Sequence, residues 1–400
     1  MQRSVQQSSS TWLIRLIVAF AAFIFIGTND GAGGVLLPSY ETFYDLSKSS
    51  VSTIFFAGTI GYLSAAFMSG MLTELLGRRL FLSLGAFAML LGMSVMASVP
   101  PWYGVLGALL VIGFGIAVID AGLNAYVASL PNNAALLNYL HAFYGVGALL
   151  GPLLASNMLA AGMGWNRVFV VLAAIAGMIL LACALSFNQT RSQSSADHDH
   201  ASGAMTITLR LPIVWTSAIF LLLYVGIEVS IGSWMFSLLT QERSMDIIWA
   251  GRLVSGYWFG LTLGRFVLGS VTKRLGNALM ISLCLAGVML GLALLMFVGH
   301  PVAAAFGLML AGFSLGPIYP TMIALISQAV SERLLPSAVG FMASFGAAGA
   351  ALFPWIAGKL ANSWGVSVVP WYAGGLSLIM LGLWVALQRM TGGQSKIEEA

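Results

Sequence analysis

The sequence predicts an all-α membrane protein with twelve transmembrane helices in two six-helix bundles that repeat in the same direction along the chain. Composition is the first reason: hydrophobic residues make up 59% of the 400 residues and charged residues only 8%, far from the averages of soluble proteins. The second reason is an internal repeat. The third is a series of long apolar stretches separated by short polar or Gly/Pro breaks.

Glycines carry the internal repeat. Fifteen glycines lie between residues 27 and 126, and seven of them recur 199 residues later, where about two matches are expected by chance. Two membrane halves repeated in the same direction are typical of secondary transporters whose substrate path lies between the halves. The matched pairs are Gly27/Gly226, Gly33/Gly232, Gly61/Gly260, Gly70/Gly269, Gly77/Gly276, Gly92/Gly291 and Gly113/Gly312.

A bilayer core of roughly 30 Å needs about 20 mostly apolar residues per helix, and twelve such stretches follow one another. The first is too long for a signal-peptide core, so we interpret it as a retained span. The predicted spans are residues 13–37, 51–75, 80–98, 102–128, 136–162, 166–187, 212–239, 248–271, 277–299, 301–330, 336–362 and 368–388.

The polar segment between the sixth and seventh spans sets the predicted domains, which are an N-terminal half of residues 1–187, a cytoplasmic linker of residues 188–210 and a C-terminal half of residues 211–400. With both termini in the cytoplasm, eleven Lys and Arg residues fall inside and five outside, as the positive-inside rule requires. The short loops fit a bacterial inner membrane.

Several ligand classes find no support in the sequence. The basic residues are scattered through short loops, so nucleic acid is not an expected partner. Cys183 and Cys284 lie inside apolar stretches and indicate neither a disulfide nor a thiolate site. The linker run from Asp197 to His200 is interpreted as a solvated loop, because no further metal ligand is near. No metal or cofactor is therefore expected.

A loop signature stands between the second and third spans and again between the eighth and ninth. Paired glycines allow helices to approach closely and to turn sharply, while charged residues can contact neighbouring helix ends. The pattern resembles the loop motif of the major facilitator superfamily, with Glu74 in place of Asp and Leu75 in place of Arg. The resemblance implies the fold of that superfamily. The motif residues are Gly70, Glu74, Gly77, Arg78, Arg79, Gly269, Lys273 and Arg274.

Ionisable residues inside predicted spans are candidates for function, because a charge at the bilayer centre costs several kcal/mol. Asn124 follows Asp120 at i+4 and shares its helical face. Glu228 and Arg265 can neutralise one another, although counting about 1.5 Å per residue separates their depths by roughly 12 Å. His141 either relays a proton to Asp120 or is a structural histidine. The five ionisable candidates are Asp30, Asp120, His141, Glu228 and Arg265.

Three segments resemble the fucose:proton symporter family. They are residues 113–124, 140–152 and 224–234. The resemblance implies that Asp30 and Asp120 handle the proton and contact sugar. The fucose transporter has Glu at the second place, and it carries amide side chains early in the fifth span, where this chain has His141 and Tyr144.

Sugar binding needs aromatic faces for the ring and polar groups for the hydroxyls. Each aromatic residue taken alone is more often used for helix packing than for ligand contact. The substrate-binding candidates, with Glu228 and Arg265 shaping the second half, are Asn29, Asn124, His141, Tyr144, Glu228, Trp234, Tyr257, Arg265, Tyr319 and Phe345.

These features predict a monomeric, proton-coupled symporter of a small hydroxylated solute, above all a monosaccharide, that works by alternating access. The expected partners are the solute, the proton and the lipid bilayer. The alternatives are an exporter of amphipathic metabolites or drugs, suggested by Met- and aromatic-rich walls, and a non-transporting nutrient sensor of the same fold. No enzyme is expected, because no Walker loop, zincin helix or nucleophile elbow is present.

Overall fold

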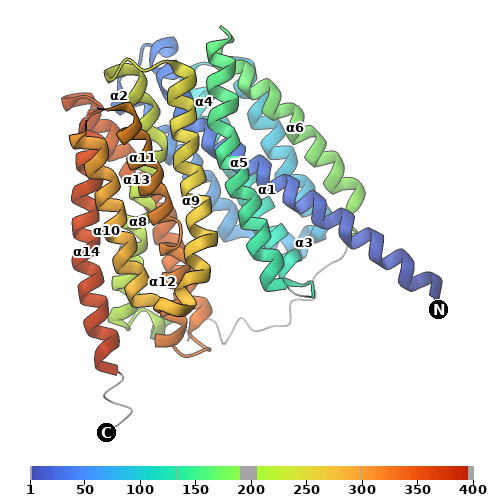
Figure 1. The fold of residues 1–400 in the computed structure, drawn as a ribbon. Coiled ribbons are helices and arrows are strands. Elements are labelled where there is room, and N and C mark those ends of the chain that lie inside the picture. Colours follow the sequence, from blue (N-terminus) through green and yellow to red (C-terminus); the bar gives the residue numbers. More distant parts are fainter. Residues whose placement is uncertain (1, 132, 190–204, 299, 395–400) are drawn as a thin grey trace. The chain divides into compact units, whose positions relative to one another are not determined.

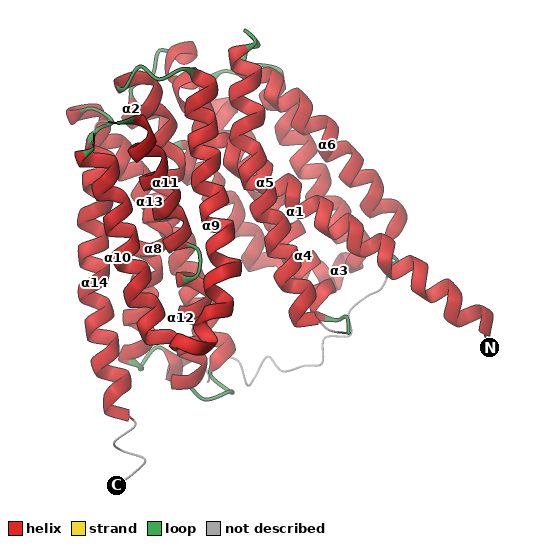
Figure 2. Cartoon of the chain, viewed as in Figure 1, coloured by secondary structure: helices red, strands yellow, loops and turns green. Residues whose placement is uncertain are grey.

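The computed structural model describes residues 2–131, 133–189, 205–298 and 300–394. Within these ranges the chain forms helices joined by short loops and contains no strand (Figure 2). It divides into two compact units, the first of residues 1–194 and 246–251 and the second of residues 195–245 and 252–400. Residues 190–204, most of the predicted linker, and with them the Asp197–His200 run, lie outside the described residues.

The first unit is built on two tight helix pairs (Figure 1). Helix α3 packs along α4 and also against α6, while α1 packs along α5. The short α2 follows α1 after a three-residue turn. The helices are α1 (Gln2–Tyr44), α2 (Lys48–Val51), α3 (Ile54–Ala97), α4 (Trp102–Ala128), α5 (Asn133–Ala160) and α6 (Trp165–Ser186).

The second unit repeats the same pairings. Helix α8 packs along α13, and α10 packs against α11 and α14. A single π-helical turn, η1, extends α8. The elements are α8 (Pro212–Ser237), η1 (Leu238–Glu242), α9 (Ile247–Leu275), α10 (Asn277–Phe297), α11 (Pro301–Leu315), α12 (Ile318–Ala329), α13 (Leu335–Trp364) and α14 (Val368–Gln394). Residues 247–251 of α9 are grouped with the first unit.

The helices agree with the twelve predicted spans. Ten stretches of the described residues are long and apolar enough to cross a membrane, and one of them, Lys48–Ala97, covers the second and third predicted spans. Helix α9 is the remaining span; it is absent from the ten because Arg252 and Arg265 lower its mean hydropathy. The prediction of an all-α, twelve-span membrane protein is confirmed.

The predicted loop between the second and third spans is a kink. Helix α3 runs through it and bends at Gly77, where φ is 70° and ψ is 162°. Gly276, the matched residue in the second unit, has φ 78° and ψ 157° and separates α9 from α10. Only glycine adopts this backbone region without strain, so the sharp turn expected from the motif glycines is present at both positions.

The predicted span 301–330 is broken into α11 and α12 at Gly316 and Pro317. Proline has no N–H to offer the preceding turn. Pro317 leaves the Phe313 carbonyl without its usual i+4 donor, and Pro320 does the same for the Gly316 carbonyl. The break therefore follows from the spacing of the two prolines.

Close helix contacts at glycine recur in both units. A Cβ atom on Gly61 would overlap the backbone oxygen of Leu110, and one on Gly260 would overlap that of Met309. Gly312, the repeat of Gly113, likewise faces a backbone oxygen. Leu110 and Met309 are themselves 199 residues apart, so the sequence repeat corresponds to a repeated packing contact.

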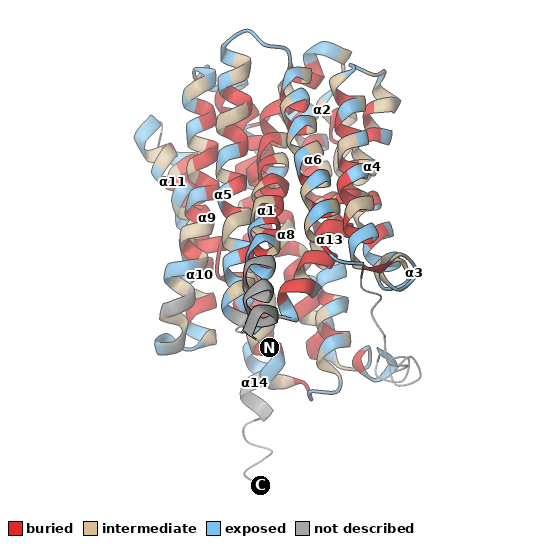
Figure 3. Ribbon diagram, turned by 90° about the vertical axis from the view of Figure 1, so that its right-hand side faces the viewer, coloured by how far each residue is buried: buried red, intermediate tan, exposed pale blue. Residues whose placement is uncertain are grey.

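Burial alternates along the helices, as Figure 3 shows. On α6, Val168, Leu172 and Ala176 are fully buried, whereas Met178 and Leu185 are 62% and 74% exposed. Exposed apolar side chains of this kind suit a helix face in contact with lipid.

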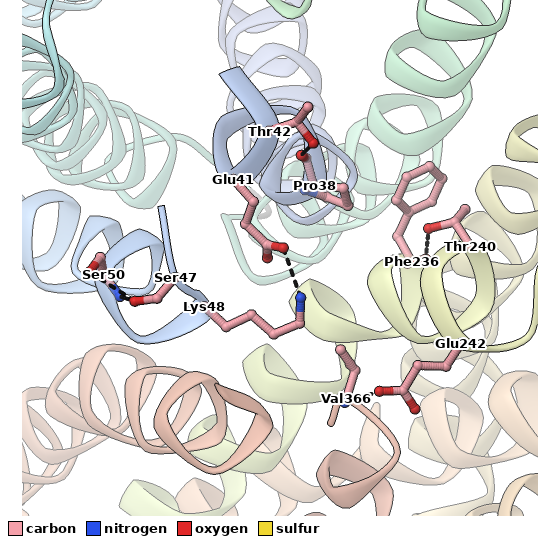
Figure 4. Close-up of polar contacts among 10 residues, drawn as sticks. All are labelled: Pro38, Glu41, Thr42, Ser47, Lys48, Ser50, Phe236, Thr240, Glu242 and Val366. Atoms are coloured by element: carbon pink, nitrogen blue, oxygen red, sulfur yellow. Dashed lines mark hydrogen bonds and ion pairs between the residues drawn. The ribbon is translucent and has the colours of Figure 1, made fainter. Parts of the chain in front are cut away.

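Polar contacts tie down helix ends within each unit (Figure 4). In the first, the Lys48 ammonium lies 2.8 Å from the Glu41 carboxylate and links α2 to α1. In the second, the Glu242 carboxylate of η1 accepts hydrogen bonds from the backbone N–H groups of Val366 and Ser367 just before α14 begins. Such bonds occupy donors that a helix N-terminus cannot pair internally.

Candidate functional site

Asp30 lies near the middle of the long apolar helix α1, and its side chain is exposed. One carboxylate oxygen accepts a hydrogen bond from the Asn29 amide at 3.1 Å, and the other accepts one from the Tyr144 hydroxyl of α5 at 3.0 Å. Both donors are predicted site residues. The structure brings all three together.

Glycines make this contact possible. A Cβ atom on Gly27 would overlap the Tyr144 backbone oxygen, and one on Gly147 would overlap that of Ile24. The backbones of α1 and α5 are therefore close enough for the Tyr144 side chain to reach Asp30. Gly147 in the fifth span thus serves close helix packing.

Asp120 of α4 is half-buried and is held in the same way. The Asn124 amide, one turn later on the same helix, donates to one carboxylate oxygen at 2.8 Å. The Tyr62 hydroxyl of α3 donates to the other at 2.9 Å. The i+4 pairing of Asp120 with Asn124 expected from the sequence is present.

The two aspartates belong to one group of residues. The charge of Asp120 acts on Asp30, and His141 of α5 interacts electrostatically with Asp120. His141 is exposed, and the Phe23 ring lies edge-on to its imidazole at 5.7 Å between centroids. We define the carboxylate cluster as Asn29, Asp30, Tyr62, Asp120, Asn124, His141 and Tyr144.

Glu228 and Arg265 form an ion pair in the second unit, with 3.6 Å between Glu228 Oε1 and Arg265 Nη2. Counting helical rise separated their depths by roughly 12 Å, but such a count ignores helix tilt and the length of the arginine side chain. Arg265 also donates from Nε to the Gly316 carbonyl at 3.3 Å. It therefore contacts both α8 and the break between α11 and α12.

The aromatic candidates of the second unit are mostly packed. Trp234 is 0% exposed, and its indole N–H donates to the Pro354 carbonyl at 2.9 Å. Tyr257 is also 0% exposed, and its hydroxyl donates to the backbone carbonyl of Glu228 at 2.9 Å. The half-buried Tyr319 faces the Tyr224 ring at 6.1 Å. Of these three predicted residues, only Tyr319 retains accessible surface.

Phe345, the remaining aromatic candidate, is half-buried. Its ring stands perpendicular to that of Trp215 at 5.8 Å and also contacts Phe341 at 4.7 Å. The structure thus places it in an aromatic group that joins α13 to the beginning of α8.

The part of the loop motif that the structure describes makes a cation–π contact. Arg78 lies 5.4 Å from the centroid of the Tyr126 ring near the end of α4. Gly70, expected to permit close helix approach, has no atom within 4 Å of the place where a Cβ would stand. That expectation was wrong, because Gly70 is exposed on α3. Glu74, Arg79 and Arg274 are exposed as well; Gly269 lies in α9, and the Lys273 side chain is outside the described residues.

Tyr62 is the functional candidate that sequence reasoning missed. A tyrosine in an apolar span looks like ordinary packing, and its match in the second half is Leu261. The available signal was the neighbouring Gly61, which marks where α3 and α4 come close. Among the described residues, no group of His, Cys, Asp or Glu could hold a metal ion.

The chain matches the model of the Major Facilitator Superfamily over residues 18–252 and 236–399. Bypass of stop codon protein 6 of Saccharomyces cerevisiae is 27% identical over 392 residues, covering 89% of this chain and 79% of the relative. The glucose/mannose transporter GlcP of Bacillus subtilis is 21% identical over 382 residues, covering 93% and 94%.

Solved structures share the fold. The nucleoside transporter NupG superposes with a TM-score of 0.81 at 14% identity, covering 94% of this chain and 99% of that one. The fucose:proton symporter FucP of E. coli gives 0.64 at 15% identity, also covering 94% and 99%. These likenesses concern the fold alone. Because the family model spans nearly the whole chain, the protein belongs to the Major Facilitator Superfamily and is a membrane transporter.

Proposed function

We propose that this transporter is a proton-coupled symporter of a small hydroxylated solute, most simply a monosaccharide, which works by alternating access of its two halves. Asp30 and Asp120 carry the proton in this proposal. Glu228, Arg265 and the accessible polar and aromatic residues near them contribute to solute binding from the second half.

The observation that carries the proposal is the carboxylate cluster. Asp30 has an exposed side chain near the middle of an apolar helix, and Asp120 is only half-buried. Ionisable groups inside a membrane are costly and are retained where they border a watery space or a partner. The donors shown on both carboxylates are neutral amide and hydroxyl groups. Neutral donors stabilise a carboxylate less than a fixed cation does, so these acids can gain and lose a proton more readily than an acid in an ion pair.

The names of related proteins favour a hydroxylated solute. GlcP is named as a glucose/mannose transporter, and FucP as a fucose:proton symporter. NupG, with the higher TM-score, is named for nucleosides, which also carry sugar hydroxyls. Hydroxyl recognition is the chemistry that these solutes share, and the amides and tyrosines of the cluster provide it.

Uptake into proteoliposomes tests the proposal. With protons more concentrated on the solute side, the wild-type protein should accumulate radiolabelled D-glucose, D-mannose or L-fucose above the equilibrium level. Asp30→Asn keeps the shape of the side chain but removes the acid, so gradient-driven accumulation should be lost. Tyr103→Phe, at an 86% exposed position, serves as the control. Unchanged accumulation by Asp30→Asn would remove this residue from the mechanism.

The same assay distinguishes the two alternatives. An exporter would lose solute from preloaded vesicles when protons are supplied on the opposite side. A nutrient sensor of this fold would bind a solute, seen as a rise in Tm, without moving it in either direction.

For the cellular setting we propose a bacterial inner membrane, with both termini and the linker of residues 188–210 in the cytoplasm and a monomeric protein. The distribution of Lys and Arg supports this orientation. Cysteine labelling of single-cysteine variants in the linker, from each side of sealed vesicles, tests it.

A further inference from the structure

The carboxylate cluster contains the same arrangement twice. Asp30 accepts from a side-chain amide on its own helix and from a tyrosine hydroxyl of a neighbouring helix, at 3.1 and 3.0 Å. Asp120 accepts from the same two kinds of donor, at 2.8 and 2.9 Å. The two tyrosines come from different helices, Tyr144 from α5 and Tyr62 from α3. The repetition of one donor set on both acids is a chemical feature that requires a reason.

The two donors differ in how they respond to a proton. An amide N–H can only donate, so Asn29 and Asn124 favour the carboxylate form. A tyrosine hydroxyl can donate or accept, because its hydrogen rotates about the C–O bond. When a proton from water binds the carboxylate oxygen, the new acid O–H can donate to the tyrosine oxygen. The tyrosine hydrogen is then released to another acceptor.

We propose that Tyr144 and Tyr62 are positioning residues that couple protonation of Asp30 and Asp120 to solute binding by reversing the direction of these hydrogen bonds. This inference rests on the proposed symport. In the deprotonated state each tyrosine hydrogen is held by its carboxylate. In the protonated state each hydrogen is presented to a solute hydroxyl. The acid O–H bond forms as an O–H bond of hydronium breaks and leaves a water molecule, and the reverse exchange returns the proton to water.

The groups that act on each acid limit the interpretation of any pH dependence. Asp30 accepts a hydrogen bond from Tyr144 and interacts electrostatically with Asp120. Asp120 accepts a hydrogen bond from Tyr62 and interacts electrostatically with His141. Both acids also border their amide donors, which do not titrate. A tyrosine variant therefore changes the donor set while Asp30, Asp120 and His141 all remain.

Thermodynamic linkage supplies the test. If protonation releases a donor to the solute, acid must strengthen solute binding, and solute must drive proton uptake to the same degree. The protein is purified in detergent, and the probe is whichever of D-glucose, D-mannose or L-fucose raises its Tm most. Calorimetry gives the affinity over a pH series, and a pH indicator in weak buffer gives the protons taken up.

Tyr144→Phe and Tyr62→Phe should each weaken solute binding about tenfold or more, since a hydrogen bond to a charged or buried polar group is lost. Both should also flatten the pH dependence of affinity and reduce the proton uptake that solute causes. Tyr139→Phe on α5, at a 55% exposed position, is the matched control and should behave as wild type. Tm without sugar shows whether each variant is folded.

Folded variants that lower affinity equally at every pH, with undiminished proton uptake, would overturn the inference. So would wild-type affinity in both variants. A wild-type protein that binds sugar without any pH dependence would instead contradict the proposed symport itself. The two failures are therefore distinguishable.

Discussion

Trp234 illustrates how a residue suited to ligand binding can serve packing instead. As an aromatic residue of the seventh predicted span, it is a candidate for stacking on a sugar ring. In the structure it has no exposed surface, and its indole N–H is paired with the Pro354 carbonyl of α13. A buried tryptophan of this kind holds α8 against α13 and stabilises the second unit.

Trp234→Phe should lower the free energy of unfolding by about 1–3 kcal/mol, because the buried Pro354 carbonyl loses its donor and the core loses volume. Sugar affinity of the folded protein should be unchanged. Thermal unfolding in detergent and calorimetry measure the two quantities. Trp364→Phe, at a 69% exposed position, is the control. A folded variant that loses sugar affinity without losing stability would show that Trp234 contributes to solute binding.

The charged members of the site could be predicted because charges are rare in apolar spans. Asp30, Asp120, Glu228 and Arg265 all stand out on that basis. Tyr62 could not be predicted, since its contact with Asp120 depends on how α3 and α4 are paired. Counting helical rise also could not predict the contact between Glu228 and Arg265, because such a count takes no account of helix tilt or of the length of the side chains.

At the scale of elements, the α1–α5 pair depends on backbone contacts at glycine. Gly27 faces the Tyr144 backbone oxygen, whereas Gly33 on the same helix has nothing within 4 Å of its Cβ position. Gly27→Ala should destabilise the protein by about 1–3 kcal/mol, the usual cost of overpacking. Gly33→Ala should stabilise it by about 0.5–1 kcal/mol, as expected for alanine in a helix interior. Thermal unfolding compares them.

A Cβ atom at Gly27 would move α1 away from α5 and so lengthen the hydrogen bond from the Tyr144 hydroxyl to Asp30. Gly27→Ala should therefore weaken sugar binding, and Gly33→Ala should not. Equal stability changes in the two variants would mean that α1 and α5 can accommodate a methyl group at Gly27 without the expected cost.

A side-chain hydrogen bond stabilises the break between α11 and α12. Pro320 provides no N–H for the Gly316 carbonyl, and Arg265 Nε donates to that carbonyl at 3.3 Å. Arg265→Gln should cost about 1–3 kcal/mol by leaving the carbonyl without a donor. Adding Pro320→Ala supplies an N–H and should recover part of that loss.

A double-mutant cycle on Tm measures this coupling between Arg265 and Pro320. The control is Pro320→Ala alone, which should gain less than it gains in the Arg265→Gln background. Equal gains in the two backgrounds would show that Arg265 does not serve the broken helix.

At the scale of the whole molecule, the two units share the same helix packing but carry different polar residues at matched positions. The glycine repeat predicted the duplicated fold, because Gly61 and Gly260 make the same contact in their own units. The polar residues do not follow the repeat: Asn29 matches Glu228, and Tyr62 matches Leu261. Glycines fix where backbones meet, whereas polar residues were free to diverge. The repeat thus predicts architecture but not the division of chemistry between the units.

That division leads to a prediction about coupling. In the first unit Asp30 and Asp120 accept hydrogen bonds from neutral amide and hydroxyl groups, whereas Glu228 of the second unit is paired with Arg265 at 3.6 Å. An acid already neutralised by a fixed cation gains less from a proton. Asp120→Asn should therefore abolish proton-driven sugar accumulation, while Glu228→Gln, the matched change in the second unit, should raise the half-saturating sugar concentration but keep gradient-driven accumulation. Vesicle uptake with and without a proton gradient measures both, and uncoupling by Glu228→Gln alone would assign the proton to the second unit.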